Sequence, residues 1–243
     1  AGARGRGDAA YLLHLDSTPA GGFENWRDGL GWETWRHDSG LVATAAERQR
    51  LARLSIAAKA ARDDAARQRH QKARQVAERI WTASRPAPPD HPYLACKDVD
   101  AQDVRVYKGV LVVPVRDLAG VLHSLQFISP GGVKRFLQGG RVHGLCCWVG
   151  PLPESTGSTP FTVCIAEGFA TGASLSEASG HAVAIAFHAG NLGPVASAIR
   201  ARYRGARIVV GADDDVNTPG NPGRTLAREA ARQVGGWLAV PNF

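Results

Sequence analysis

Apolar and polar positions follow different spacings in successive parts of the chain. In residues 8–40, short apolar stretches alternate with turn signals such as Gly21-Gly22, which favour a small antiparallel β meander. Residues 44–83 contain neither Gly nor Pro, and a thin apolar stripe runs through good helix formers, which predicts one long helix. The proline-rich residues 85–92 end this helix because proline cannot continue it.

The predicted meander contains several large aromatic residues, and two interpretations of them are open. They are Phe23, Trp26, Trp32 and Trp35. Tryptophan side chains usually pack, so we interpret this group as the core of the meander. The alternative is an exposed platform for a ligand.

Two apolar runs after the prolines predict an antiparallel hairpin. Residues 110–115 and 122–128 are rich in β-branched and apolar side chains, and the loop 117–120 between them contains Asp and Gly. Residues 134–137 are expected to add a third strand. The polar residues 151–160 are rich in Pro, Ser, Thr and Gly, and we interpret them as a boundary.

From residue 161 onwards, the pattern changes to strands that alternate with helices. This alternation is typical of βαβ units and a parallel sheet. Gly180, Gly205 and Gly235 each follow a predicted helix, as C-cap glycines do. The expected elements are a strand at 161–166, a helix at 169–179, a strand at 182–187, a helix at 191–203, a strand at 207–211, a helix at 223–234 and a strand at 237–240.

These patterns place the chain in the α/β class and divide it into four segments. The segments are an N-terminal β meander (1–43), a long basic helix (44–85), a mixed β-rich basic subdomain (86–155) and a parallel βαβαβ domain (156–243). No run approaches the roughly 20 apolar residues that a membrane helix needs. The first residues also lack the apolar stretch of a secretory signal, so we expect a cytoplasmic protein with no membrane association.

The positive charge of the chain is concentrated in the predicted helix. Residues 44–85 contain eleven Lys or Arg against four Asp or Glu, whereas the rest is balanced at eighteen against eighteen, so the net charge of +7 lies in this segment. A basic rod of this kind can lie along nucleic-acid phosphates. A solvated linker helix explains the same composition, and charge alone does not decide between the two. The candidate DNA-binding residues are Arg62, Arg67, Arg69, Lys72 and Arg74.

Carboxylates follow two of the predicted parallel strands, at the point where each strand ends. Glu167 follows the strand at 161–166, and Asp213 and Asp215 follow the strand at 207–211. Ligands bind at this edge of open α/β sheets, and carboxylates gathered there repel one another unless a cation lies among them. We therefore expect a site for Mg²⁺ or Mn²⁺. The alternative is a turn in which the aspartates only open the next helix.

The glutamate and the Asp-x-Asp pair resemble the motifs of the Toprim domain, which primases, topoisomerases and some nucleases share. Glu167 matches the Toprim glutamate, and Asp213 and Asp215 match its two aspartates. Residues 109–117 and 133–137 resemble the basic half of the RNA-polymerase domain of primases. Four further segments are closer still to plasmid- and phage-encoded Toprim primases, namely His91-Pro-Tyr-Leu94, Glu167-Gly-Phe-Ala-Thr171, Ala189-Gly-Asn-Leu192 and Asn221-Pro-Gly223.

Two positions depart from these family patterns. Thr171 stands where replicative primases have an acid, as it does in the plasmid-type group, and His188 stands where that group usually has an acid. We interpret His188 as a tolerated loop residue that at most tunes the metal site.

The resemblance implies the catalytic core of a DNA primase that makes short RNA primers on single-stranded DNA. Two divalent ions held by the three acids would take part, with Lys134 as a further catalytic residue. Nucleoside triphosphates, a single-stranded template and a helicase or other replication domain are the implied partners. The expected substrate-binding residues are Arg116, Arg141, Lys97, Lys108, Arg135 and Arg224.

Two other functions remain open from the sequence. One is a Toprim nuclease or topoisomerase fragment, although the segment 110–137 is closer to primases and no region could house a separate tyrosine-bearing domain. The other is a Toprim module that binds nucleic acid without polymerase activity, which the intact acids argue against.

Overall fold

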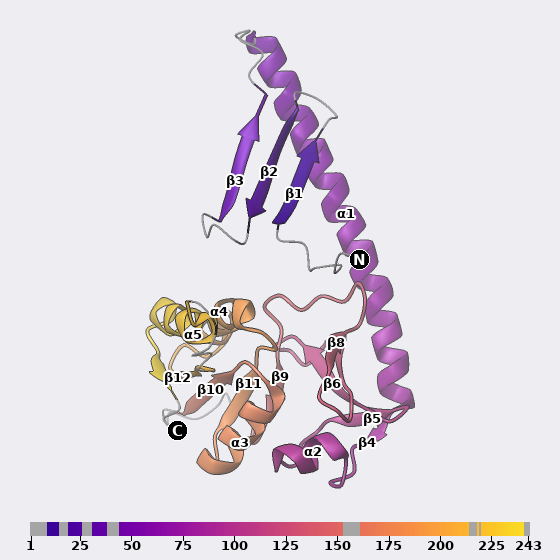
Figure 1. The fold of residues 1–243 in the computed structure, drawn as a ribbon, viewed down its shortest axis with the longest axis vertical. Coiled ribbons are helices and arrows are strands. Elements are labelled where there is room, and N and C mark those ends of the chain that lie inside the picture. The colour runs from indigo at the N-terminus through magenta and orange to yellow at the C-terminus, as the bar shows by residue number, and fades with distance from the viewer. Residues whose placement is uncertain are drawn as a thin grey trace, which may run out of the picture. The chain divides into compact units, whose positions relative to one another are not determined.

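A computed structural model describes residues 9–14, 19–25, 31–37, 44–152, 161–213, 218 and 220–240 (Figure 1). The chain forms two compact units, Ala1–Ala65 and Ala66–Phe243, and each is described by itself. No helix in the described part is long and apolar enough to cross a membrane. The four-segment division stays a prediction.

The first unit contains the predicted antiparallel meander. Its strands are β1 (Ala9–His14), β2 (Ala20–Asn25) and β3 (Trp32–Arg36), paired in the order β1-β2-β3. Gly21 and Gly22 lie inside β2, where they pair with β1 and β3, so their interpretation as a turn was wrong.

The aromatic side chains of the meander do not form the expected core. Phe23 is 41% exposed, Trp32 47% and Trp35 45%. The indoles of Trp32 and Trp35 instead cover the backbone of Gly22 and Gly21, where any Cβ would meet them. A ring can lie on a strand in this way only where the neighbouring residue has no side chain. Trp26 lies outside the described residues.

The predicted long helix is confirmed as α1 (Ala45–Ala83), whose residues from Ala66 onwards belong to the second unit. It begins with a capping box, in which Glu47 Oε2 accepts from Thr44 N at 2.7 Å and Thr44 Oγ1 accepts from Glu47 N at 3.2 Å. The predicted end at the prolines is also confirmed, because β4 follows at Arg85–Pro86.

An antiparallel sheet follows α1, with its strands in chain order. The two strands of the predicted hairpin are present as β6 and β7, and the third expected strand as β8. A short helix, α2 (Pro92–Lys97), comes before the hairpin. The strands are β4, β5 (Arg105–Tyr107), β6 (Val110–Arg116), β7 (Leu122–Ile128) and β8 (Lys134–Phe136).

The C-terminal sheet is parallel except at one edge, as Figure 1 shows. Its order is β13-β12-β10-β11-β9, and β9 (Cys147–Val149) joins antiparallel to β11. The predicted strands and helices are all present, most with ends shifted by one or two residues. They are β10 (Thr162–Ala166), α3 (Phe169–Ser179), β11 (Ala182–Ile185), the short 3-10 helix η1 (Ala189–Asn191), α4 (Leu192–Arg202), β12 (Arg207–Gly211), α5 (Pro222–Gln233) and β13 (Trp237–Ala239).

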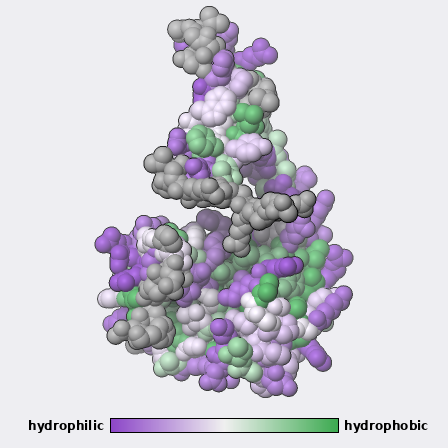
Figure 2. Space-filling model, viewed as in Figure 1, coloured by the Kyte–Doolittle hydropathy of each residue, from purple (hydrophilic) through white to green (hydrophobic). Residues whose placement is uncertain are grey.

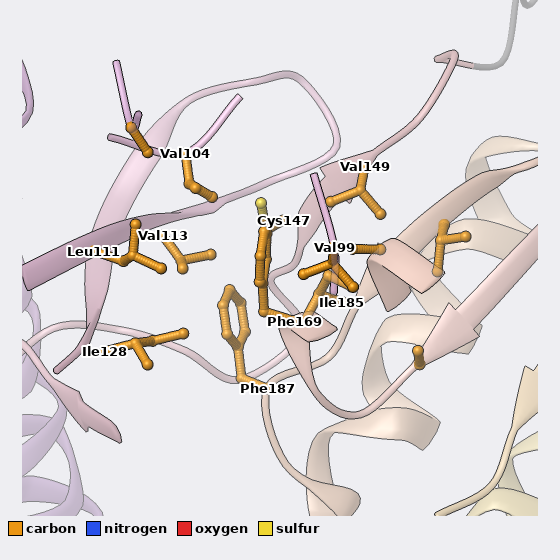
Figure 3. Close-up of a cluster of buried hydrophobic side chains, with 14 of the residues drawn as sticks. Val99, Val104, Leu111, Val113, Ile128, Cys147, Val149, Phe169, Ile185 and Phe187 are labelled. Atoms are coloured by element: carbon orange, nitrogen blue, oxygen red, sulfur yellow. The ribbon is translucent and has the colours of Figure 1, made fainter. Parts of the chain in front are cut away.

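Three apolar layers hold the second unit together. The first joins the inner face of the antiparallel sheet to α3 and one face of the parallel sheet, with Phe169 and Phe187 between Val113 and Ile185 (Figure 3). The second packs α4 and α5 on the opposite face of the parallel sheet. The third packs the end of α1, including Trp81, on the outer face of the antiparallel sheet.

Candidate active site

Glu167 and Asp213 lie at the carboxyl ends of two neighbouring parallel strands. The pairing of Ile165 with Val210 sets β10 and β12 in register, so Glu167 is level with the residue just before Asp213. The chain leaves β10 through α3 towards β11 and returns through α4 to β12 on the other side of β10. The two carboxylates therefore stand at the topological switch point of the sheet, where open α/β sheets bind ligands.

Lys134 is brought to the same place from the antiparallel sheet. Its Nζ lies 3.5 Å from the position that a Cβ on Gly168 would occupy, directly after Glu167 in the chain. Lys134 pairs with Ile128, so its side chain is on the inner face of the sheet. Phe136, two residues further along β8, meets the ring of Phe187 edge-to-face with 5.8 Å between centroids, which holds the strand against the end of β11.

A second lysine lies beside Lys134. Lys97, at the end of α2, lines the same cavity of about 380 Å³. Cys96 also lines it and is exposed. The structure therefore places Lys134 beside Gly168 and Lys97 in the same cavity as Lys134.

Asn191 is a residue whose role the sequence analysis missed. Its side chain is fully buried and makes hydrogen bonds through both polar atoms. Oδ1 accepts from Gly144 N at 2.7 Å, and Nδ2 donates to the carbonyls of Leu145 at 3.0 Å and Ala186 at 2.9 Å. Asn191 thus ties the segment before β9 to the end of β11. A polar residue between apolar neighbours in Ala189-Gly-Asn-Leu192 was the available signal.

The residues before Asn191 are held in an unusual conformation. Phe187 has φ of +73°, which a bulky side chain rarely adopts, and it is buried. Such strain persists only where the surrounding packing enforces it. The pKa of the neighbouring His188 is lowered by burial and then by the charge of His143. The ring of His188 also meets Phe136, with 6.5 Å between centroids.

Other predicted basic residues lie elsewhere. Arg116 faces Trp81, with its guanidinium carbon 5.3 Å from the ring centroid. Arg135 pairs with Phe127, which packs in the outer layer with α1. Lys108 lies in the β5–β6 turn, with Nζ 5.3 Å from the ring centroid of Tyr107.

Two further candidates, Arg141 and Arg224, are exposed. Arg224 stands in the first turn of α5, where its backbone N donates to Asn221 Oδ1 at 3.3 Å.

The predicted DNA-binding residues of α1 are exposed, and Figure 2 shows hydrophilic side chains along much of this helix. Arg62 belongs to the first unit, and Arg67, Arg69, Lys72 and Arg74 to the second. Arg74 forms an ion pair with Glu78 at 2.9 Å.

Asp215 lies outside the described residues. Within the described part, no group of three His, Cys, Asp or Glu side chains could hold a metal ion. The Asp215 contribution to the metal site therefore stays a prediction.

Comparison with known proteins agrees with this geometry. Residues 162–241 match the model of the Toprim domain family. The chain is also similar to two proteins of Escherichia coli, both named DNA primase TraC. It is 33% identical to each, over 252 residues of one and 259 of the other. The predicted resemblance to Toprim primases is confirmed.

The chain spans only part of these relatives. The alignments cover 99% and 100% of this chain but 23% and 17% of the two proteins. Among solved structures, the primase fragment of the bacteriophage T7 primase-helicase protein is similar, with a TM-score of 0.46, 14% identity and 66% of each chain covered.

Proposed function

We propose that this chain is the catalytic core of a DNA primase, which synthesises short RNA primers on single-stranded DNA. One observation carries the proposal. Glu167 and Asp213 follow adjacent parallel strands at the same edge of the sheet, and Lys134 lies beside Gly168. Similarity to proteins named DNA primase over nearly the whole chain supports it.

We further propose that Glu167, Asp213 and Asp215 hold two Mg²⁺ or Mn²⁺ ions. Carboxylate oxygens at a switch point fit these hard cations, which prefer oxygen ligands. Such ions would make the primer 3′ oxygen a better nucleophile and stabilise the leaving pyrophosphate.

The protein side chains then have separate tasks. Lys134 and Lys97 bind the triphosphate, since both line one cavity, Lys134 Nζ approaches Gly168, and both can neutralise phosphate charge. Arg141 and Arg224 are further candidates for phosphate binding, and exposed arginines of α1 hold the template. In phosphoryl transfer, such positioning and charge stabilisation supply most of the catalysis.

The proposal also places the chain in a larger assembly. A helicase or another replication domain, in the same or another chain, would supply the unwound strand. The activity would take place in the cytoplasm.

A primer-synthesis assay tests the proposal. The purified chain is incubated with single-stranded DNA, labelled nucleoside triphosphates and Mg²⁺ or Mn²⁺, and the products are separated by length. We expect short labelled RNA, lost in Glu167→Gln and kept in Glu229→Gln, which removes an exposed carboxylate from α5. Metal-dependent nicking of the DNA without primers would favour a Toprim nuclease instead. DNA binding without either product would favour a non-catalytic module.

A further inference from the structure

A second cavity lies on the outer face of the antiparallel sheet, away from the face that carries Lys134. It has a volume of about 460 Å³ and is lined by Trp81 at the end of α1, Arg105 of β5, Arg116 of β6 and Trp148 of β9. This volume is within the range of roughly 300–1,000 Å³ that is common for small-ligand sites.

Two guanidinium groups share one indole in this cavity. The guanidinium carbon of Arg105 lies 4.4 Å from the centroid of the Trp81 ring, and that of Arg116 lies 5.3 Å from it. Hydrogen bonds fix both arginines, from Arg105 Nη1 to the carbonyl of Trp81 at 2.8 Å and from Arg116 Nη1 to the carbonyl of Gly120 at 2.7 Å. Each guanidinium has five N–H donors, so most of them stay available.

The arginines of this cavity have no carboxylate in direct contact within the described part of the chain, although the charge of Asp117 acts on Arg116. Among the described residues, neither Arg105 nor Arg116 forms an ion pair with a carboxylate. Asp103 lines the same cavity but is exposed, and Asp117 is engaged by His123 at 2.8 Å. Two half-buried guanidinium groups side by side repel each other, and a phosphate between them would relieve this repulsion with bidentate geometry.

The surroundings favour a nucleotide within a strand over a free anion. The walls of the cavity include apolar residues such as Val104 and Leu152, which suit a base. Arg67 and Arg74 are exposed on the same helix as Trp81 and precede it by fourteen and seven residues, close to whole helical turns, so the three side chains share one face of α1. A basic helix that leads to an aromatic pocket is the arrangement with which proteins track single strands.

We propose that this cavity binds one nucleotide of single-stranded DNA, with its phosphate on Arg105 and Arg116, whose guanidinium groups Trp81 holds, and its base along the apolar wall that includes Leu152. The site is separate from the carboxylates and holds the template outside the catalytic cleft. The choice of DNA as the strand rests on the proposed function.

The test is a titration of labelled oligo(dT) by fluorescence anisotropy at several salt concentrations, without metal or nucleotide. Leu152→Glu puts a carboxylate at the cavity from a side chain that is 64% exposed, so it leaves the fold intact. Ala178→Glu, at an exposed position of α3, makes the same charge change elsewhere. Trp81→Leu removes the ring that holds the two guanidinium groups, and Trp81→Phe keeps an aromatic ring.

We expect Trp81→Leu to weaken binding several-fold, because the two guanidinium groups lose the ring that holds them, with Trp81→Phe close to the unchanged chain. Leu152→Glu should weaken binding at low salt, and Ala178→Glu should not. Arg116→Gln should reduce the slope of log K against log salt by about 0.7, the value expected when the protein neutralises one phosphate fewer on a single strand.

Unchanged affinity in both Leu152→Glu and a folded Trp81→Leu variant would overturn the proposal. Release of the oligonucleotide by inorganic phosphate alone would assign the cavity to a free anion and would also overturn it. Because the titration contains no metal or nucleotide, its result is independent of primer synthesis. Failure of the site is thereby distinguished from failure of the proposed function.

Discussion

Asn191 Oδ1 accepts a hydrogen bond from the backbone N–H of Gly144 at 2.7 Å, although 47 residues separate them. Asn191→Ala leaves this N–H and the carbonyls of Leu145 and Ala186 without their partner inside the protein. We expect a loss of about 2–4 kcal/mol in the free energy of unfolding, because buried polar groups left unsatisfied are costly. Urea denaturation measures it.

Asn191→Asp tests the hydrogen bonds that Asn191 donates separately from the one that it accepts. It keeps the shape and the acceptor for Gly144, but a carboxylate cannot donate to the two carbonyls. We expect it to be at least as destabilising as the alanine near neutral pH, and to recover stability in acid as the carboxyl group takes up a proton. An aspartate variant as stable as the unchanged chain would contradict the assigned role.

Asp213→Asn should abolish primer synthesis while DNA binding persists. The amide keeps the size of the side chain but removes a charge that the proposed cations need. Primer assays and oligonucleotide titrations of the same preparation measure both properties. Retained synthesis in this variant would remove Asp213 from the metal site.

Cys96 provides a chemical probe of the cavity that Lys97 and Lys134 line. The other three cysteines are buried, and burial raises the pKa of the Cys146 thiol to about 12 and also raises the pKa of Cys147 and Cys164. A thiol reagent should therefore modify Cys96 first.

Bound nucleoside triphosphate should slow the modification of Cys96 several-fold, as mass spectrometry over time would measure. Lys134→Gln should abolish the protection, because it removes a proposed phosphate contact. Arg228→Gln, at an exposed position of α5, is the control. Equal modification rates with and without triphosphate would argue against this cavity as the nucleotide site.

Exposed arginines of α1 should set the salt dependence of DNA binding. Replacing Arg67, Arg69 and Lys72 by Gln should weaken binding and flatten the salt dependence, by about 0.7 in slope for each phosphate of a single strand that is no longer neutralised. Replacing three exposed arginines of α4 and α5 by Gln, namely Arg202, Arg228 and Arg232, removes the same charge elsewhere and provides the control. Unchanged affinity in a filter-binding titration would leave α1 as a solvated linker helix.

Acid should destabilise the second unit partly through Asp117. Burial acts to raise its pKa, but the hydrogen bonds from His123 and from the backbone of Val121 and Ala119 outweigh it, so the pKa is lowered. A carboxyl group with a lowered pKa stabilises the fold fully above its unfolded pKa of about 3.9, and this stabilisation is lost as the pH falls towards the folded pKa.

Asp117→Asn should consequently reduce the difference in unfolding free energy between pH 6 and pH 3. Urea denaturation of both proteins at the two pH values measures it. An equal pH dependence in both would show that Asp117 does not contribute.

Strands and helices could be predicted from the sequence wherever one spacing persisted, as in α1, β6, β7 and the parallel sheet. Pairing between segments that lie far apart in the sequence could not be predicted. Cys147–Val149 was assigned to the β-rich subdomain, but it pairs with β11. The face of the sheet on which Arg116 lies could not be predicted either, because a register shift between Val115 and Arg116 interrupts the alternation of the strand.

The candidate carboxylates could be predicted because acids directly after buried strands mark one edge of the sheet. Side chains that meet across two sheets, such as Lys134 and Gly168, were suggested only by the family resemblance. The exposure of the tryptophans in the meander was not predicted, because a pair of glycines in the sequence does not show that aromatic rings will lie on it.

Because the antiparallel strand β9 pairs with β11, the segment that matches the Toprim family is smaller than the unit that folds. A truncated protein that began at residue 161 would lack β9 and the carbonyl partners of Asn191 before it. Its β11 would present an open backbone edge, which invites strands of other molecules to pair. The segment that matches the Toprim family is therefore expected to aggregate when it is separated from the rest of the second unit.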